Sequence, residues 1–376
     1  MEKDRSWMHD MPRLGFGMMR LPQKEGAIDH EQVCSMVDAY MRSGMNYFDT
    51  AYVYHGGLSE IEFREAVVKR YPRESYRIAT KLPAWAMHSK DDRDRIFQEQ
   101  LEKCGVDFFD CYLLHSIEDG SKYETYEAYD CFRWGEEMKK QGKILHFGFS
   151  FHGSPALLRQ ILDLHPEVDF VQIQLNYADW NSSVVHSGEL YEILHSRDIP
   201  VIVMEPVKGG ILANLSPELE EIFHTLRPEA SDASWALRFV SSLPGVMTVL
   251  SGMSTQEQMQ DNLQTMSCFE PLSEEEMHAV REVRAQMQAV QLIECTACRY
   301  CTDGCPMKIS IPDIFSAFNA KRQYPTDKRP NMYYRNLTSR SGKACDCIAC
   351  GQCEGICPQH LPIIELLRKA SELFDA

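Results

Sequence analysis

Eight short apolar runs alternate with longer segments of helical periodicity over the first 290 residues, and this alternation limits the fold more than any other feature of the sequence. Short apolar runs predict buried strands, and the periodic segments between them predict helices. The expected strands cover residues 13–21, 45–51, 76–82, 108–115, 144–150, 170–176, 200–205 and 245–252. The expected helices cover residues 31–43, 58–71, 91–104, 125–141, 154–163, 187–197, 231–241 and 255–263.

Repeated strand–helix units of this kind predict a parallel sheet. Eight units in residues 1–290 fit a (β/α)8 TIM barrel, which typically needs roughly 250 residues. A doubly wound sheet is the competing architecture. Its glycine-rich turn is missing, because Gly15 and Gly17 are followed by Met18, Met19 and Arg20 with no third glycine. We therefore expect an α/β barrel over residues 1–290.

The charge balance bears on partners and location. The chain has 39 basic and 55 acidic residues, a formal net charge of −16. Such an excess of acidic residues argues against binding to nucleic acid or to an acidic membrane. The first ten residues are charged and lack an apolar core, and no apolar run approaches the roughly 18 residues of a membrane span. We expect a cytoplasmic protein with no membrane segment.

Two copies of the run Cys-x2-Cys-x2-Cys-x3-Cys-Pro lie near the end of the chain. This is the bacterial ferredoxin run, in which three cysteines bind one iron–sulfur cluster and the fourth binds the other. Zinc is the alternative, but zinc sites usually pair two Cys-x2-Cys halves and need no third and fourth cysteine before proline. Crosswise ligation predicts Cys295, Cys298, Cys301 and Cys357 around one [4Fe–4S] cluster and Cys347, Cys350, Cys353 and Cys305 around a second.

Residues 291–376 are thus expected to form a small α+β bacterial-ferredoxin-like domain after the barrel. This tail resembles the dicluster ferredoxin domain that follows the barrel in some oxidoreductases. Cys345 is out of register with both runs and is expected to be a spare thiol. Helices are expected at residues 273–290, 311–321 and 361–374, with a basic loop over residues 324–341.

Reactive side chains follow three neighbouring strands of the expected barrel. Asp49 and Tyr54 follow the second strand, Lys81 ends the third and His115 ends the fourth. Each of them taken alone could be a turn residue, a loop aromatic, a solvated strand end or a core histidine. Together they are expected to form a catalytic site, because active sites of barrels lie at the carboxyl ends of the strands.

These four residue types suit proton transfer to a carbonyl oxygen. A neighbouring ammonium stabilises a phenolate and lowers the pKa of the phenol, so Lys81 is expected to activate Tyr54. Asp49 would keep Lys81 charged, and His115 would hydrogen-bond the substrate oxygen. No side chain can supply a hydride, so a nicotinamide cofactor is required.

The residues from about 14 to 262 resemble the aldo/keto reductase family. The resemblance rests on Asp49 and Tyr54 in FDTAYVY, Lys81 in ATKLP and His115 in LLHS, in the order and spacing of the family. It implies that Tyr54 is the general acid for carbonyl reduction and the base for alcohol oxidation. It also implies a set of cofactor contacts along the later strands and loops. These are Ser150, Gln172, Met204, Glu205, Pro206, Lys208, Gly252, Gln258 and Asn262.

Two positions and one loop depart from the family pattern. Phe151 follows Ser150 where the family often has Asn, and Met204 stands where many members stack an aromatic ring on the nicotinamide. A thioether makes a softer contact with a ring. The loop from Gly252 to Asn262 has no Lys or Arg to pair with a 2′-phosphate. The resemblance implies NADP(H), and this loop leaves NAD(H) open.

Two functions are consistent with these features. The first is a nicotinamide-dependent oxidoreductase that interconverts a small carbonyl compound and its alcohol, with two [4Fe–4S] clusters for electron transfer to a redox protein partner or for structure. The alternative is a redox-sensing or scaffold protein whose barrel binds a nucleotide with little turnover. A hydride carries two electrons and a cubane passes one, and no flavin-binding pattern is present to convert between them. The complete set of Asp49, Tyr54, Lys81 and His115 favours the enzyme.

Overall fold

The computed structural model describes residues 6–182, 185–288, 292–293, 295, 299–357 and 361–375. The chain divides into two compact units. One lies within residues 1–213 and 226–280, and the other within residues 214–225 and 281–376. The predicted boundary between residues 290 and 291 falls outside the described residues and stays a prediction.

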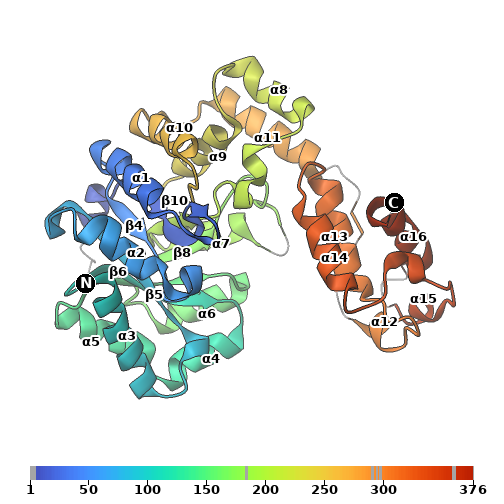
Figure 1. Ribbon diagram of the computed structural model, residues 1–376, viewed down its shortest axis with the longest axis horizontal. Helices are drawn as coiled ribbons and strands as arrows, with labels where there is room; N and C mark the ends of the chain where they lie inside the picture. Colours follow the sequence, from blue (N-terminus) through green and yellow to red (C-terminus); the bar gives the residue numbers. More distant parts are fainter. Residues whose placement is uncertain are drawn as a thin grey trace. The chain divides into compact units, whose positions relative to one another are not determined.

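The first unit is a closed barrel of parallel strands, visible in Figure 1 as a ring of arrows with helices outside it. The strands follow the order β1-β10-β9-β8-β7-β6-β5-β4 around the barrel. Their bounds are β1 Leu14–Gly17, β4 Tyr47–Asp49, β5 Arg77–Pro83, β6 Phe109–Ile117, β7 Ile144–Phe151, β8 Phe170–Gln174, β9 Val201–Met204 and β10 Val246–Ser251. Each of the eight apolar runs supplies one strand, so the predicted (β/α)8 architecture is confirmed.

Helices of this unit pack against the outside of the strands, and a short hairpin, β2 Gln23–Lys24 with β3 Ala27–Ile28, precedes the first of them. Most of these helices begin at a side-chain cap, and the capped starts of all but α4 lie within one residue of the predicted start. The capping residues are Asp29, Ser89, Asp119, Ser154, Ser231 and Thr255. The helices are α1 His30–Arg42, α2 Ser59–Phe63, α3 Lys90–Cys104, α4 Gly120–Ala128, α5 Cys131–Lys140, α6 Pro155–Leu164, α7 Ser187–Ser196, α9 Asp232–Ser241 and α10 Gln256–Ser267, and α11 Glu274–Gln288 begins in this unit and ends in the second.

The single helix expected at residues 125–141 is wrong, because the structure has α4 and α5 there. Asp130 separates them with a φ of 58°, in the left-handed region that a continuous helix excludes. Between the strands at 200–205 and 245–252, only residues 231–241 are expected to be helical. The structure adds α8 Pro217–Leu226 before it.

Side chains fill the barrel interior. The enclosed cluster is buried and almost wholly apolar, and the N-terminal segment packs against it through Trp7, Met8 and Met11. The Trp7 ring also stacks on His146, with centroids 3.7 Å apart. The strand residues of the enclosed cluster are Tyr47, Ala79, Cys111, Leu113, Phe170, Ile202, Met247 and Leu250. The barrel is therefore a packed core and not a pore, and a ligand site is expected only at its rim.

The second unit is mainly helical, with one isolated parallel bridge, Ile309 to Gly342, among its described residues. Its helices surround an apolar core that includes Ile314, Phe315 and Leu367. Besides most of α8, they are α12 Tyr300–Asp303, α13 Ile311–Gln323, α14 Arg329–Thr338, α15 Gln352–Ile356 and α16 Ile363–Phe374.

The basic loop expected at residues 324–341 is wrong, because α14 occupies most of it. Pro330 lies at the start of this helix, where a missing N–H costs nothing. Tyr334 is buried, and its hydroxyl donates to Asp375 Oδ2 at 2.8 Å and accepts from the backbone N–H of Ala344 at 2.8 Å. Among the described residues, no helix has the length and apolar character needed to cross a bilayer.

Candidate active site and cysteine cavity

A cavity of about 490 Å³ opens at the carboxyl end of the barrel, within the size range of small-molecule sites. All eight strands contribute a lining residue at or near their carboxyl ends. These residues are Gly17, Asp49, Lys81, His115, Ser150, Gln172, Met204 and Ser251. Tyr54 lines the same cavity from the loop after β4. The structure thus brings the four predicted catalytic side chains together.

Lys81 is the centre of this group. Its Nζ donates to Asp49 Oδ1 at 2.6 Å, to the carbonyl oxygen of Thr50 at 2.7 Å and to Tyr54 Oη at 3.4 Å. The side chains of Lys81 and Asp49 are only 1% and 4% exposed. Burial lowers the pKa of Lys81, but the charges and hydrogen bonds of Asp49 and Tyr54 together raise it more, so the net pKa is raised. Lys81 is therefore an ammonium at neutral pH.

Tyr54 is the last residue of a turn after β4, in which its backbone N–H donates to the carbonyl of Ala51 at 3.1 Å. Burial raises the pKa of the Tyr54 phenol, and the neighbouring Lys81 charge offsets part of that rise. The expected net lowering of this pKa is not found. The phenol is protonated at neutral pH and can act as a proton donor.

His115 lies beside Tyr54, with ring centroids 6.0 Å apart and ring planes at 80°. Burial lowers the pKa of His115 well below its usual value, and the charge of Lys81 lowers it further. The imidazole is therefore neutral. Its Nδ1 is buried and has no hydrogen-bond partner among the described residues. The Tyr126 hydroxyl lies 2.7 Å from the carbonyl oxygens of both Leu82 and His115, so it links the two strand ends by donating its one proton to either of them.

The predicted cofactor contacts of the middle strands also line the cavity. Ser150 Oγ accepts from the backbone N–H of Ser116 at 2.7 Å. Gln172 Nε2 donates to Met204 Sδ at 3.5 Å. Gln172 Oε1 is buried and unpartnered among the described residues. One acceptor of Gln172 is thus available to a ligand.

The remaining predicted contacts follow the last two strands, β9 and β10, and all but one of them line the cavity. Asn262 Nδ2 donates to Ser251 Oγ at 2.7 Å, and Gln258 Oε1 accepts from the backbone N–H of Ser254 at 2.8 Å. The others that line the cavity are Glu205, Pro206 and Gly252. Lys208 does not line it; its ammonium forms an ion pair with Asp179.

Several lining residues were not predicted from the sequence. Arg20, Ser116, His152 and Asp261 belong to this set. Ser116 directly follows His115 in the sequence, so its position could have been inferred from the strand end. Arg20 follows β1, and nothing in the local sequence marks its approach to the loop after β10.

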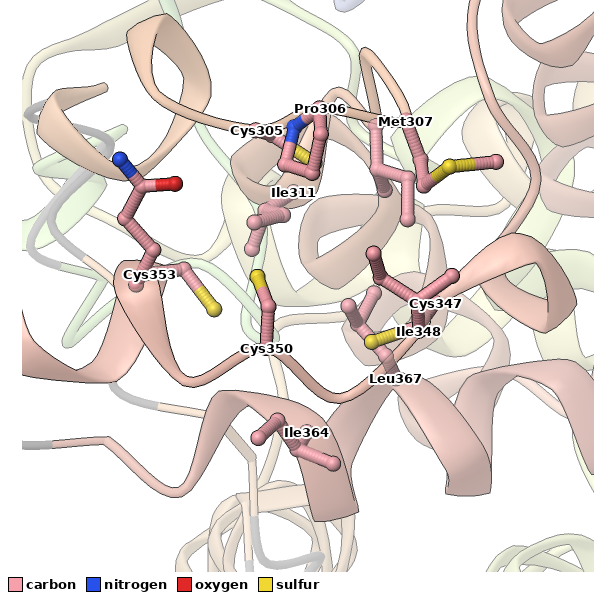
Figure 2. A pocket seen from close by; sticks show the side chains of 12 residues that line it. Cys305, Pro306, Met307, Ile311, Cys347, Ile348, Cys350, Cys353, Ile364 and Leu367 are labelled. Carbon is pink, nitrogen blue, oxygen red and sulfur yellow. The ribbon is translucent and has the colours of Figure 1, made fainter.

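In the second unit, four thiols line one mostly apolar cavity. Figure 2 shows Cys305, Cys347, Cys350 and Cys353 around it, with Met307 and Ile348 beside them. The fourth cysteine of one run thus meets the first three of the other, as the crosswise arrangement predicts. Four thiols are the ligand set of a [4Fe–4S] cluster.

The other predicted cluster ligands are described in part. Cys301 is buried in the core of the second unit, and Cys295 and Cys357 pack against the same core. Cys298 lies outside the described residues. Helices α12 and α15, which belong to different runs, are in contact. Cys345 is exposed and does not line the four-thiol cavity.

A parallel barrel that gathers a phenol, an ammonium, a carboxylate and an imidazole at its strand ends defines an oxidoreductase of the carbonyl–alcohol class. The chain belongs to the aldo/keto reductase family, whose sequence model matches residues 13–285. A 4Fe-4S dicluster domain matches residues 279–362. Both predicted resemblances are confirmed.

Individual relatives agree with this assignment. An L-galactose dehydrogenase of Arabidopsis thaliana is 26% identical over 303 residues, which cover 74% of this chain and 91% of the relative. An NADH-specific methylglyoxal reductase of Escherichia coli is 25% identical over 224 residues, which cover 54% and 65%. The solved holo form of an aldo-keto reductase from Bacillus halodurans is 25% identical with a TM-score of 0.59, covering 72% of this chain and 91% of that one.

Proposed function

We propose that the protein interconverts a small carbonyl compound and its alcohol with NADP(H) or NAD(H), and that Tyr54 handles the proton. The observation that carries this proposal is the position of Lys81 Nζ, 2.6 Å from Asp49 and 3.4 Å from Tyr54, at the wall of a large cavity. A buried ammonium that is locked to a carboxylate stabilises a phenolate beside it without itself losing a proton.

In the direction of reduction, each group has one role. The nicotinamide cofactor would supply the hydride, with both of its electrons, that the carbonyl carbon accepts as the π electrons of the C=O bond pass to the oxygen. Tyr54 Oη gives its proton to the carbonyl oxygen, and Lys81 stabilises the phenolate that remains. His115, which is neutral, donates a hydrogen bond that orients the same oxygen. Alcohol oxidation reverses these steps, with Tyr54 as the base.

The lining of the cavity suits a nicotinamide dinucleotide. The buried and unpartnered Gln172 Oε1 can accept from a carboxamide, and Ser150 lies on the neighbouring strand. Asn262 and Gln258 offer side-chain amides where the residues after β10 line the cavity. The Escherichia coli relative is named as NADH-specific, so NADH stands beside NADPH as the cofactor to test.

We further propose two [4Fe–4S] clusters. Cys347, Cys350, Cys353 and Cys305 would hold one, which the shared cavity supports. Cys295, Cys298, Cys301 and Cys357 would hold the other. The clusters supply one-electron transfer to a redox protein partner, or they stabilise the small domain.

The remaining assignments follow the sequence. We propose domains at residues 1–290 and 291–376, a cytoplasmic location, and no binding of nucleic acid or membrane. The net charge of −16 supports the last point.

Anaerobic oxidation of NADPH and NADH in the presence of a panel of aldehydes and ketones tests the enzymatic role. Wild-type protein is expected to turn over at least one carbonyl, and Tyr54→Phe is expected to reduce kcat by about 100-fold or more because the proton donor is lost. Cofactor binding should persist in the variant. Binding without turnover by the wild type would support the redox-sensing or scaffold alternative instead.

A further inference from the structure

Arg20 is a cavity-lining cation that the proposed proton transfer does not use. It ends the short helical turn Met18–Arg20 that follows β1. Among the described residues, the other lysine or arginine that lines the cavity is Lys81, which is buried against Asp49. Burial lowers the pKa of both cavity histidines, His115 and His152. Arg20 therefore carries the accessible positive charge at this site.

The loop after β10 holds Arg20 in place. Ser254 Oγ donates to the backbone carbonyl of Arg20 at 2.7 Å, across 234 residues of sequence. A Cβ atom at Gly252 would lie only 3.3 Å from Arg20 Cδ and 3.4 Å from its Cβ. The absence of a side chain at Gly252 leaves room for the aliphatic part of Arg20. The Arg20 side chain thus packs against the loop of residues 252–262, which has no basic residue of its own.

The present partner of Arg20 binds it weakly. Arg20 Nη2 lies 3.8 Å from Glu205 Oε1, and the two side chains are 46% and 33% exposed. An exposed ion pair of this length contributes little to stability and can be exchanged. Asp261 also lines the cavity, but its Oδ2 accepts from Ser231 Oγ at 2.7 Å. A guanidinium makes stronger and often bidentate contacts with phosphate oxygens.

We propose that Arg20 binds a phosphate group of the nicotinamide dinucleotide, and that it exchanges Glu205 for that phosphate when the cofactor enters. This inference rests on the proposed function. The phosphate is either the diphosphate, which both cofactors share, or the 2′-phosphate, which NADPH alone carries.

Equilibrium titration of the cluster-loaded protein with NADPH and with NADH, read by protein fluorescence, tests the inference. Arg20→Gln is expected to raise Kd by about tenfold or more for at least one of the two cofactors. Arg20→Lys keeps the positive charge but loses the two-pronged guanidinium, so its Kd should lie between those of wild type and Arg20→Gln. Arg159→Gln is the matched control, because Arg159 is 52% exposed, faces Glu189 at 3.9 Å and does not line the cavity. It should bind both cofactors like wild type.

The two cofactors identify the phosphate. Equal weakening of NADPH and NADH by Arg20→Gln assigns the contact to the diphosphate, and weakening of NADPH alone assigns it to the 2′-phosphate. Either result should come with a smaller dependence of Kd on salt, because one cation fewer contacts the anion. Kd values within twofold of wild type for both cofactors, in a variant with an unchanged melting temperature, would overturn the inference. Failure of wild type to bind either cofactor would overturn the proposed function together with it.

Discussion

Lys81 Nζ donates to Asp49 Oδ1 at 2.6 Å, and both side chains are buried at the end of the barrel. Removing two charges from water is costly, so a pair of this kind contributes less to stability than its geometry suggests. Its use lies in the chemistry. The carboxylate keeps the ammonium charged beside Tyr54, in surroundings where an isolated lysine would lose its proton.

Breaking this pair on one side is expected to destabilise the barrel. Asp49→Asn and Lys81→Met should each lower the free energy of unfolding by roughly 3–5 kcal/mol, because each leaves one buried charge or polar group without its partner. The double variant Asp49→Asn/Lys81→Met should lose clearly less than the sum. Denaturant unfolding followed by tryptophan fluorescence measures this cycle. Strict additivity of the two losses would show that the pair is not coupled.

Stability should depend on pH through His115. The pKa of His115 is well below its usual value in the folded protein, so the unfolded chain binds more protons once the pH falls below about 6.5. This group therefore costs no stability at pH 7.5 and about 1.4 kcal/mol at pH 5.5. His115→Gln is expected to lose that much less stability than wild type between these two pH values. An identical pH dependence of the two proteins would contradict a neutral His115.

Glu276 is expected to anchor the start of α11. Burial raises the pKa of Glu276, but hydrogen bonds from Arg238, the Ser273 backbone N–H and Arg227 lower it more, to about 2. The contribution of this carboxylate is fully present above pH 4.5 and is lost as the pH falls towards 2. At pH 7, Glu276→Gln should cost roughly 2–4 kcal/mol of unfolding free energy.

Glu275→Gln serves as the control for Glu276, because the neighbouring carboxylate is exposed and forms no ion pair with a described residue. It should change the unfolding free energy by less than about 0.5 kcal/mol. Equal losses in the two variants would show that the contact between Glu276 and Arg238 contributes nothing specific.

Metal analysis distinguishes ligand from spare thiol in the small domain. Wild-type protein reconstituted without oxygen should hold about eight irons per chain, and Cys350→Ser should hold about four, because one cubane loses a ligand. Cys345→Ser should keep about eight, since Cys345 lies outside the four-thiol cavity. Zinc in place of iron, or an equal loss in both variants, would refute the proposed ligand sets.

Local sequence patterns predicted most of the barrel and of its site. Asp49, Lys81 and His115 could be grouped because parallel strands in a barrel bring their carboxyl ends together, whatever the intervening helices contain. The capped helix starts were predictable for a similar reason, since Ser89 or Thr255 acts through its own neighbours in sequence.

Features that depend on distant contacts were not predictable. Arg20 reaches the site through packing against Gly252 and a bond from Ser254, neither of which leaves a local pattern. Helix α14 was not predicted because its exposed residues mix Arg329 and Arg335 with Met332 and Tyr333, and its few buried positions, such as Tyr334, become recognisable only in the folded core. The rise in the pKa of Tyr54 has the same origin, because burial depends on the whole cavity.

The fate of deuterium from NADPH dideuterated at C4, or from the corresponding NADH, tests the central claim most directly. If Tyr54 and Lys81 serve a direct hydride transfer, the product alcohol formed by wild type carries deuterium on its carbinol carbon, and Tyr54→Phe forms the same labelled product about 100-fold more slowly or slower. A product alcohol whose carbinol hydrogen comes from solvent would contradict the account. In that case the carbon-bound hydrogen would not come from the cofactor as a hydride, and electrons would reach the carbonyl one at a time.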